Sequence, residues 1–245
     1  MGVNEDAIYR AVFSARYESA ISDASGIIES IGAHAGRVAV AVSGGKDSTA
    51  MAHIALTVLP VKPLLVWNDS GLELPESEAV VRSLAARLGC RLAIATGKAL
   101  DIKRKLGGFG AEKKARRTDE LAIIYPVREL LRAEGMEVNL VGLREQESYT
   151  RKMVIRKMGP TYQSKRWGCL VGWPMRRWSA ADVFAYIDEH DLPLHPAYTR
   201  TDWADRNSIR VSWLWDSTRE RFGDIEYLRR YYPKIWAQLK SEGLI

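Results

Sequence analysis

A glycine-rich loop that carries a lysine and an aspartate follows an apolar run near the start of the chain. Residues 38–42 read VAVAV, and residues 43–48 read SGGKDS. Glycines let backbone N–H groups approach an oxyanion, and a helix that starts there adds unpaired N–H groups and the positive end of its dipole. The candidate phosphate ligands are Ser43, Gly44, Gly45, Lys46, Asp47 and Ser48. A plain strand-to-helix turn would explain the glycines but not their polar neighbours, so the loop predicts phosphate binding.

Each polar residue of the loop has a distinct expected use. Lys46 neutralises phosphate charge, and Ser43 and Ser48 offer hydroxyl donors. Asp47 suits either the N-cap of the next helix or a ligand of phosphate-bound Mg²⁺. The spacing is not that of the Walker P-loop, because no Ser or Thr follows Lys46 directly.

The elements that must position this loop alternate between strands and helices. Apolar runs at 38–42, 63–69, 90–96 and 137–143 predict strands, and amphipathic or apolar segments predict helices between them, at 48–59, 76–89 and 121–134. Residues 97–120 break the pattern and predict a mobile loop or insertion. This order predicts an α/β fold, a doubly wound and mostly parallel sheet with helices on both faces.

The remaining segments flank this core. Residues 5–33 predict one or two leading helices, and residues 201–245 predict a small helical, aromatic-rich C-terminal extension packed on a main domain of residues 1–200. Ser179 and Asp182 form a capping box for a helix over 181–190, so Asp182 is interpreted as a cap.

Three further segments, taken with SGGKDS, resemble a known family. They are WNDSGLELPES (67–77), GLREQESYTR (142–151) and GWPMRRWSAADVFAYIDEHDLPLHPAY (172–198). The loop resembles the pyrophosphate-binding PP-loop of the adenine nucleotide α-hydrolase superfamily, which contains the N-type ATP pyrophosphatases. The three segments resemble the phosphoadenosine phosphosulfate (PAPS) reductase family within it, and the likeness covers roughly residues 36–200.

The resemblance implies a nucleotide site at the carboxyl edge of the sheet, where parallel sheets bind ligands. Trp67, Asn68 and Asp69 would hold the adenosine half through backbone amides. Gly142 would let the nucleotide approach the fourth strand. Arg144 and Arg151 would form bidentate contacts with phosphate, sulfate or a carboxylate, and surface ion pairing with Glu145 or Glu147 is their alternative.

A complete PP-loop suits an intact triphosphate, which favours ATP with Mg²⁺ over PAPS. The leading hypothesis is an enzyme that cleaves ATP between the α- and β-phosphates, adenylates an unknown acceptor and releases pyrophosphate. Lys46, Asp47 and Arg144 are its candidate catalytic residues, and Asp47 is the candidate metal ligand. The acceptor, a nucleotide, a nucleic acid or a small acid, is not specified by any motif.

Two alternatives stay open. The first is a PAPS or adenylyl-sulfate reductase whose nucleophile is Cys169, beside Lys165 and Arg166; a buried structural cysteine is the commoner role. The C-terminal Glu-Cys-Gly-[LI]-His motif of such reductases is not present, and two cysteines cannot hold an iron–sulfur cluster, so none is expected. The second alternative is a nucleotide- or nucleic-acid-binding protein without turnover.

His195 invites an acid–base role but occupies a position where the family has Asn or His, so it is expected to shape a turn.

The charge is uneven. The chain of 245 residues carries a net charge of +6, and its basic residues concentrate in 102–117 and 144–177. Such runs are usually solvated surface, and their alternative is a polyanion site for nucleotide or nucleic acid. No run reaches the roughly 18 apolar residues that span a bilayer. The N-terminus does not resemble a signal peptide, so we expect a cytoplasmic protein with no membrane partner.

Overall fold

The structure is a computed structural model that describes residues 4–109, 120–200, 202, 205–207, 209, 211 and 224–245. The described residues form one six-stranded sheet in the order β3-β2-β1-β4-β6-β5, parallel except for β5, which is antiparallel to β6. The strands are β1 (Val38–Val42), β2 (Leu64–Asp69), β3 (Leu92–Thr96), β4 (Val138–Val141), β5 (Thr161–Ser164) and β6 (Cys169–Gly172).

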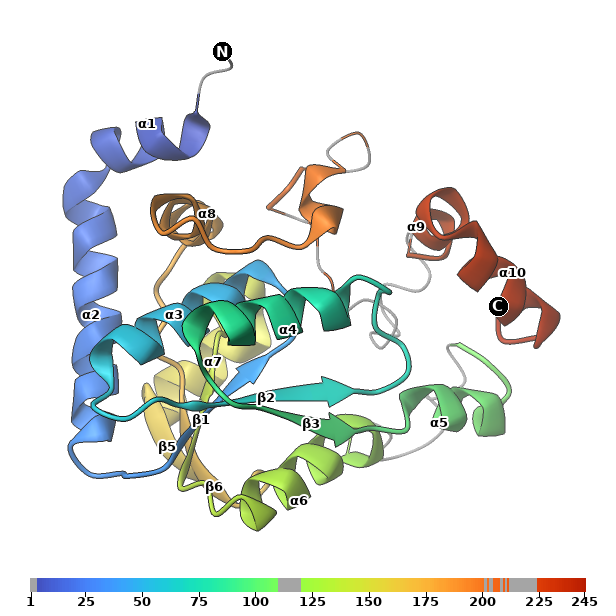
Figure 1. Ribbon diagram of the computed structural model, residues 1–245, viewed down its shortest axis with the longest axis horizontal. Helices are drawn as coiled ribbons and strands as arrows, with labels where there is room; N and C mark the ends of the chain where they lie inside the picture. Colours follow the sequence, from blue (N-terminus) through green and yellow to red (C-terminus); the bar gives the residue numbers. More distant parts are fainter. Residues whose placement is uncertain are drawn as a thin grey trace.

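Helices cover both faces of this sheet. In Figure 1, α3 and α4 lie over one face and α6 lies under the other. The α-helices are α1 (Glu5–Val12), α2 (Ser14–Gly32), α3 (Lys46–Val58), α4 (Ser77–Leu88), α5 (Ala99–Leu106), α6 (Tyr125–Ala133), α7 (Tyr149–Met158), α8 (Ala180–Glu189), α9 (Asp224–Tyr231) and α10 (Pro233–Ser241). No helix of the described ranges is long and apolar enough to cross a membrane.

The central strand β1 serves both layers, because successive side chains of a strand point to opposite faces. Val40 and Val42 belong to the core cluster that includes Met51 of α3. Ala39 belongs to the cluster that includes Val127 and Leu131 of α6. Nearly every side chain of β1 is therefore buried, as its continuous apolar run predicts. The doubly wound, mostly parallel α/β fold is confirmed.

The prediction of a loop over 97–120 is wrong for its first part. Ala99–Leu106 is helix α5, which ends at Gly107 in the left-handed conformation with φ 85°. The clustered lysines and arginines hide its periodicity, but Ala99, Leu100 and Ile102 pack in one apolar cluster. Residues 110–119 lie outside the described part, so the prediction is untested there.

Three elements were not predicted at all: α7, β5 and β6. The two strands have four residues each and form an antiparallel hairpin at the sheet edge. Strand β5 reads TYQS, which has no apolar alternation to mark it. Helix α7 reads YTRKMVIRKM, in which basic residues interrupt the apolar spacing. The segment between β4 and α8 is thus more regular than its sequence suggests.

The C-terminal helices α9 and α10 confirm that the end of the chain is helical, and they lie on the side toward which β2 and β3 point (Figure 1). The N–H of Phe109 donates to the Leu244 carbonyl at 2.8 Å, and Arg104 pairs with Glu242 at 2.8 Å. Tyr227 shares an apolar cluster with Leu74 of the main sheet region. These contacts join the end of the chain to α5 and to the start of α4, and the domain boundary at residue 200 stays a prediction.

Candidate functional site

The SGGKDS loop connects β1 to α3 at the carboxyl edge of the sheet. Gly44 has φ 75°, and a Cβ there would lie 3.4 Å from the Ser77 carbonyl oxygen, so the turn favours glycine. Helix α3 begins at Lys46 with Gly45 as its N-cap. The interpretation of Asp47 as an N-cap is therefore wrong, because Asp47 already lies in the first turn.

The two serines of the loop bond to the loop itself. The Ser48 hydroxyl donates to the Gly45 carbonyl at 2.9 Å and accepts the Ser43 N–H at 3.0 Å. The Ser43 hydroxyl lies 3.3 Å from the Ser48 hydroxyl. In this structure the serines hold the loop in shape, and their contacts with phosphate stay a prediction.

The first turn of α3 offers backbone donors. The Lys46 N–H donates to the Tyr198 hydroxyl at 3.2 Å. The N–H groups of Asp47 and Ser48 have no hydrogen-bond partner among the described residues. Unpaired N–H groups at a helix N-terminus favour an anion. Tyr198 was not singled out from the sequence, although it lies within the family-like segment 172–198.

A buried charge cluster adjoins these donors. The Asp47 carboxylate accepts from Lys46 Nζ at 2.9 Å and from Arg144 Nε at 2.5 Å. Lys46 is 3% exposed and Arg144 is 5% exposed, and Arg151 pairs with Glu147, which lies 3.7 Å from Arg144. Three cations thus face two carboxylates, which leaves one positive charge in excess. The cluster is suited to a phosphate that takes over part of the role of Asp47.

Arg144 and Arg151 have different surroundings. Arg144 is buried against the loop, which places it beside the proposed phosphate ligands. Arg151 is a third exposed and pairs with Glu147, the ion pair that the sequence left open as its alternative role. A direct contact between Arg151 and nucleotide stays a prediction.

Gly142 brings β4 close to the start of α3. A Cβ at Gly142 would lie 2.7 Å from the Asp47 carbonyl oxygen and 3.2 Å from the Ser48 nitrogen. Glycine is required here because the chain passes against the backbone of α3. Because Gly142 has no side chain, β4 can pack close to α3, which brings Arg144 to Asp47. The expected approach of a nucleotide to Gly142 stays a prediction.

The end of β2 lies beside β1, with Val42 in register with Trp67. The Trp67 ring is buried in the main core, so only its backbone is available to a ligand. Asn68 donates through Nδ2 to the Ala122 carbonyl at 3.3 Å, and its buried Oδ1 has no partner among the described residues. Asp69 accepts the Gly71 N–H at 3.1 Å and so shapes the turn. Asn68 Oδ1 is the free acceptor at this strand end.

His195 shapes a turn, as expected. Its ring is fully buried, Nδ1 accepts the Ala197 N–H at 3.1 Å, and Nε2 lies 3.3 Å from the Ser77 hydroxyl. Burial lowers the pKa of His195 to about 4. The ring is therefore neutral at pH 7, and it holds the short helix Pro196–Thr199 that carries Tyr198 to the loop.

Asp182 and Cys169 have structural surroundings. Asp182 completes the capping box with Ser179 and accepts from the Tyr9 hydroxyl at 2.7 Å. Cys169 is 6% exposed at the start of β6, and burial raises the pKa of its thiol. A raised pKa disfavours the thiolate, which is the reactive form.

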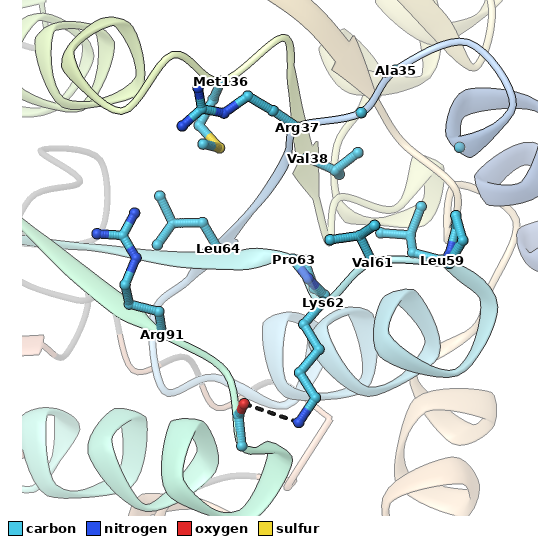
Figure 2. Close-up of a pocket in the computed structure, with 14 residues that line it drawn as sticks. Ala35, Arg37, Val38, Leu59, Val61, Lys62, Pro63, Leu64, Arg91 and Met136 are labelled. Atoms are coloured by element: carbon cyan, nitrogen blue, oxygen red, sulfur yellow. Dashed lines mark hydrogen bonds between the residues drawn. The ribbon is translucent and has the colours of Figure 1, made fainter.

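A cavity of about 410 Å³ lies at the opposite, amino edge of the sheet (Figure 2). Arg37, Lys62 and Arg91 line it together with apolar side chains such as Leu64 and Met136. All three cations are exposed. The cavity is separate from the loop, because β1 runs between them.

The comparisons with known proteins identify the family. The model of the phosphoadenosine phosphosulfate reductase domain matches residues 37–229, and the chain belongs to this family. A PAPS reductase of Alkalilimnicola ehrlichii is 26% identical over 167 residues, which are 66% of this chain and 65% of that protein. An uncharacterized protein of Methanocaldococcus jannaschii is 26% identical over 206 residues, 83% of this chain but only 41% of that protein.

Solved structures share the fold. The PAPS reductase of Candida auris has a TM-score of 0.54 at 19% identity and covers 70% of this chain and 81% of its own. The FMN adenylyltransferase of Candida glabrata has a TM-score of 0.57 at 14% identity, with 75% and 59% covered. The U34-tRNA thiolase of Methanococcus maripaludis has a TM-score of 0.53 at 14% identity, with 90% and 80% covered. One adenine nucleotide α-hydrolase-like fold thus occurs in proteins with different names and activities.

A nucleotide-bound Mg²⁺ fits the donors of the loop. Mg²⁺ commonly takes one or two protein carboxylates and completes its shell with phosphate oxygens and water. Asp47 is the carboxylate nearest the free amides of α3. Across the described residues, no group of three His, Cys, Asp or Glu could hold a metal without such help.

Proposed function

We propose that this protein is an ATP-dependent adenylyl-transferring enzyme that binds ATP with Mg²⁺ at the SGGKDS loop. The acceptor nucleophile attacks the α-phosphorus and forms a new bond to AMP. The bond between the α-phosphorus and the bridging oxygen breaks, its electron pair leaves with pyrophosphate, and the proton of the acceptor passes to solvent.

The observation that carries the proposal is the pair of buried cations, Lys46 and Arg144, around the half-buried Asp47 and beside two unpaired helix amides. Buried cations interact strongly with an added anion, because little water screens them. The donors are fixed before the ligand arrives, which is the arrangement that stabilises developing charge in a transition state. A pyrophosphate leaving group develops such charge.

Each residue has a stated part. Lys46 and the N–H groups of Asp47 and Ser48 would bind the β- and γ-phosphates and stabilise the leaving pyrophosphate. Arg144 would bind a phosphate oxygen through the guanidinium N–H groups that do not contact Asp47. Asp47 would hold Mg²⁺, which supplies neutralisation of phosphate charge when bound. Asn68 Oδ1 would accept a hydrogen bond from the adenine ring, and the backbone N–H groups at 67–69 would donate to it.

Pyrophosphate release tests this proposal. The purified protein is incubated with ATP, Mg²⁺ and a panel of nucleotides, nucleic acids and small acids, and pyrophosphate and AMP adducts are measured. Lys46→Gln removes the charge and keeps a polar side chain that is one atom shorter, and Lys62→Gln at the amino edge is the matched control. We expect release with at least one acceptor, lost in Lys46→Gln only. No release with any acceptor, together with tighter binding of PAPS than of ATP, would overturn the proposal.

The named relatives favour one second candidate, a thiol-dependent PAPS reductase. Cys169 would be its nucleophile. The burial of Cys169 and the raised pKa of its thiol count against that role. Sulfite release from PAPS with a thiol reductant that disappears in Cys169→Ser but persists in Cys90→Ser would establish it.

A further inference from the structure

The segment from Ser148 to Ala181 has an unusual charge. It contains eight basic residues and no Asp or Glu. The eight are Arg151, Lys152, Arg156, Lys157, Lys165, Arg166, Arg176 and Arg177. A stretch of this kind must obtain its counter-charges from elsewhere in the fold or from a partner.

The fold supplies counter-charges to only part of this segment. Arg166 pairs with Glu120 at 2.8 Å, and Arg176 pairs with Asp23 at 2.9 Å. In α7, Arg151 pairs with Glu147. Lys152, Arg156 and Lys157 of the same helix have no ion pair with any residue that the structure describes. The uncompensated charge of the segment is thus concentrated on α7.

These cations share one side of α7 with two exposed apolar side chains. Tyr149 is 77% exposed and Met153 is 45% exposed. Positions 149, 152, 153 and 156 follow the spacing of one helix face, and Lys157 adjoins it. The opposite side of the helix is buried through Ile155, which packs with Val171 and Trp173. The outer face therefore presents a ring, a thioether and three cations, of which Lys152 is half-buried and Arg156 and Lys157 are exposed.

We propose that this outer face of α7, formed by Tyr149, Lys152, Met153, Arg156 and Lys157, binds a single-stranded segment of nucleic acid. Unpaired cations match a phosphate backbone. An exposed aromatic ring next to them provides a platform on which an unpaired base stacks. A duplex offers phosphates but no free base face for Tyr149.

Other anionic partners fit this face less well. A membrane-surface helix needs a continuous apolar face, whereas cations at 152, 156 and 157 separate Tyr149 and Met153 from Met158. An acidic peptide would match the charge but would leave the ring of Tyr149 without a specific contact.

The position of α7 connects this face to the nucleotide site. Helix α7 follows the short helix Glu145–Glu147, and Glu147 lies between Arg151 of α7 and Arg144 of the charge cluster. A strand bound along α7 would therefore extend toward the loop. If the proposed function holds, the acceptor is a single-stranded nucleic acid. This assignment of the acceptor rests on the proposed function, whereas the binding surface does not.

Binding without ATP tests the surface by itself. The probes are labelled single-stranded 12-mers of RNA and of DNA with the same mixed sequence, the corresponding DNA duplex, and vesicles of anionic phospholipid. The test variant is Lys152→Gln/Arg156→Gln/Lys157→Gln. The control variant removes three exposed lysines from α5 and α10, Lys105→Gln/Lys234→Gln/Lys240→Gln. Thermal unfolding verifies that both variants fold.

We expect the α7 variant to bind single strands at least tenfold more weakly and to lower the slope of log Kd against log salt by about 2, since each single-strand phosphate contact contributes about 0.7. Tyr149→Ala should weaken single-strand binding about tenfold without changing that slope. Tyr149→Phe keeps an aromatic ring and should bind single strands as tightly as the wild type. The RNA and DNA arms show whether the ribose hydroxyl contributes.

Three results would overturn the inference: equal losses in the α7 and control variants, duplex binding as tight as single-strand binding with no effect of Tyr149→Ala, or binding to vesicles in preference to either strand. Pyrophosphate release is measured separately. Normal strand binding without release would leave this surface intact and would count only against the proposed function.

Discussion

The two edges of the sheet carry similar charges in different surroundings. At the carboxyl edge, Lys46 and Arg144 are buried and share one carboxylate, Asp47, next to unpaired helix amides. At the amino edge, Lys62 and Arg91 are exposed. Lys62 donates to the Gly89 carbonyl at 3.1 Å (Figure 2), and Arg91 pairs with Glu134. The amino edge has a cavity of about 410 Å³, and the carboxyl edge has two buried cations that share one carboxylate beside unpaired helix amides. Burial and incomplete pairing, more than cavity volume, mark the candidate site.

The largest expected effect comes from removing the shared carboxylate. Asp47→Asn leaves Lys46 and Arg144 buried without their common counter-charge, and we expect the free energy of unfolding to fall by about 3 kcal/mol. Added pyrophosphate should restore much of it, because the anion replaces the lost charge. Thermal unfolding with and without pyrophosphate measures both effects. At the amino edge, Glu134→Gln is the matched change, and a loss as large there would break the comparison.

Acid should destabilise the carboxyl edge through His195. Burial lowers the pKa of His195 to about 4, so the unfolded chain takes up a proton between pH 6.5 and 4 while the folded chain does not. The contribution of His195 to the free energy of unfolding is therefore fully present above pH 6.5 and is lost as the pH falls. At pH 5 the expected loss from this residue is about 2 kcal/mol. Urea unfolding at pH 7 and pH 5 measures the loss.

His195→Asn should reduce this acid dependence. Asn can still accept the Ala197 N–H, and it does not titrate. Part of the dependence should remain, because burial and the nearby His190 lower the pKa of His53 to about 4 as well. The exposed His34 at the amino edge provides the matched control substitution, His34→Asn. An unchanged profile in His195→Asn would show that protonation of His195 does not cause the loss of stability in acid.

A smaller effect is expected from adding one methyl group at each edge. Gly142→Ala places a Cβ 2.7 Å from the Asp47 carbonyl oxygen, which must shift, and we expect a loss of about 1 to 2 kcal/mol. Gly36→Ala at the amino edge meets nothing within 4 Å and should change the stability by less than about 0.5 kcal/mol. Chemical denaturation of both variants checks the difference, and equal stabilities would show that β4 does not position α3.

The smallest effects belong to the exposed cations of the cavity. Lys62→Gln and Arg91→Gln should each alter stability by less than about 0.5 kcal/mol, because the exposed hydrogen bond of Lys62 and the exposed ion pair of Arg91 contribute little. Neither should change the affinity for ATP. Calorimetric titration of ATP into each variant checks this, and a tenfold loss in either would move the nucleotide site to the amino edge.

Much of the fold was readable from the sequence because the parallel core uses strong signals. The apolar runs of β1 to β4 and the capping box of Ser179 and Asp182 have direct sequence signatures. Helix α5 and the hairpin β5–β6 were missed, since their charged or short segments pack through tertiary contacts that local patterns do not show.

The candidate site was predictable in composition but not in geometry. The residue types of SGGKDS indicate phosphate chemistry, and Arg144 follows a recognisable strand end. The ion pair between Asp47 and Arg144 joins residues 97 positions apart, and the Tyr198 hydroxyl reaches the loop from 152 positions away. Only the folded chain brings these groups together, which is why Tyr198 was missed. The N-cap interpretation of Asp47 is wrong for a local reason, because α3 already begins at Lys46.

Titration of ATP with Mg²⁺ into the wild-type protein, Lys46→Gln and Lys62→Gln tests the central claim most directly. The account predicts that the wild type and Lys62→Gln bind ATP alike and that Lys46→Gln binds at least tenfold more weakly. Equal binding by the wild type and Lys46→Gln, with a loss in Lys62→Gln, would contradict it.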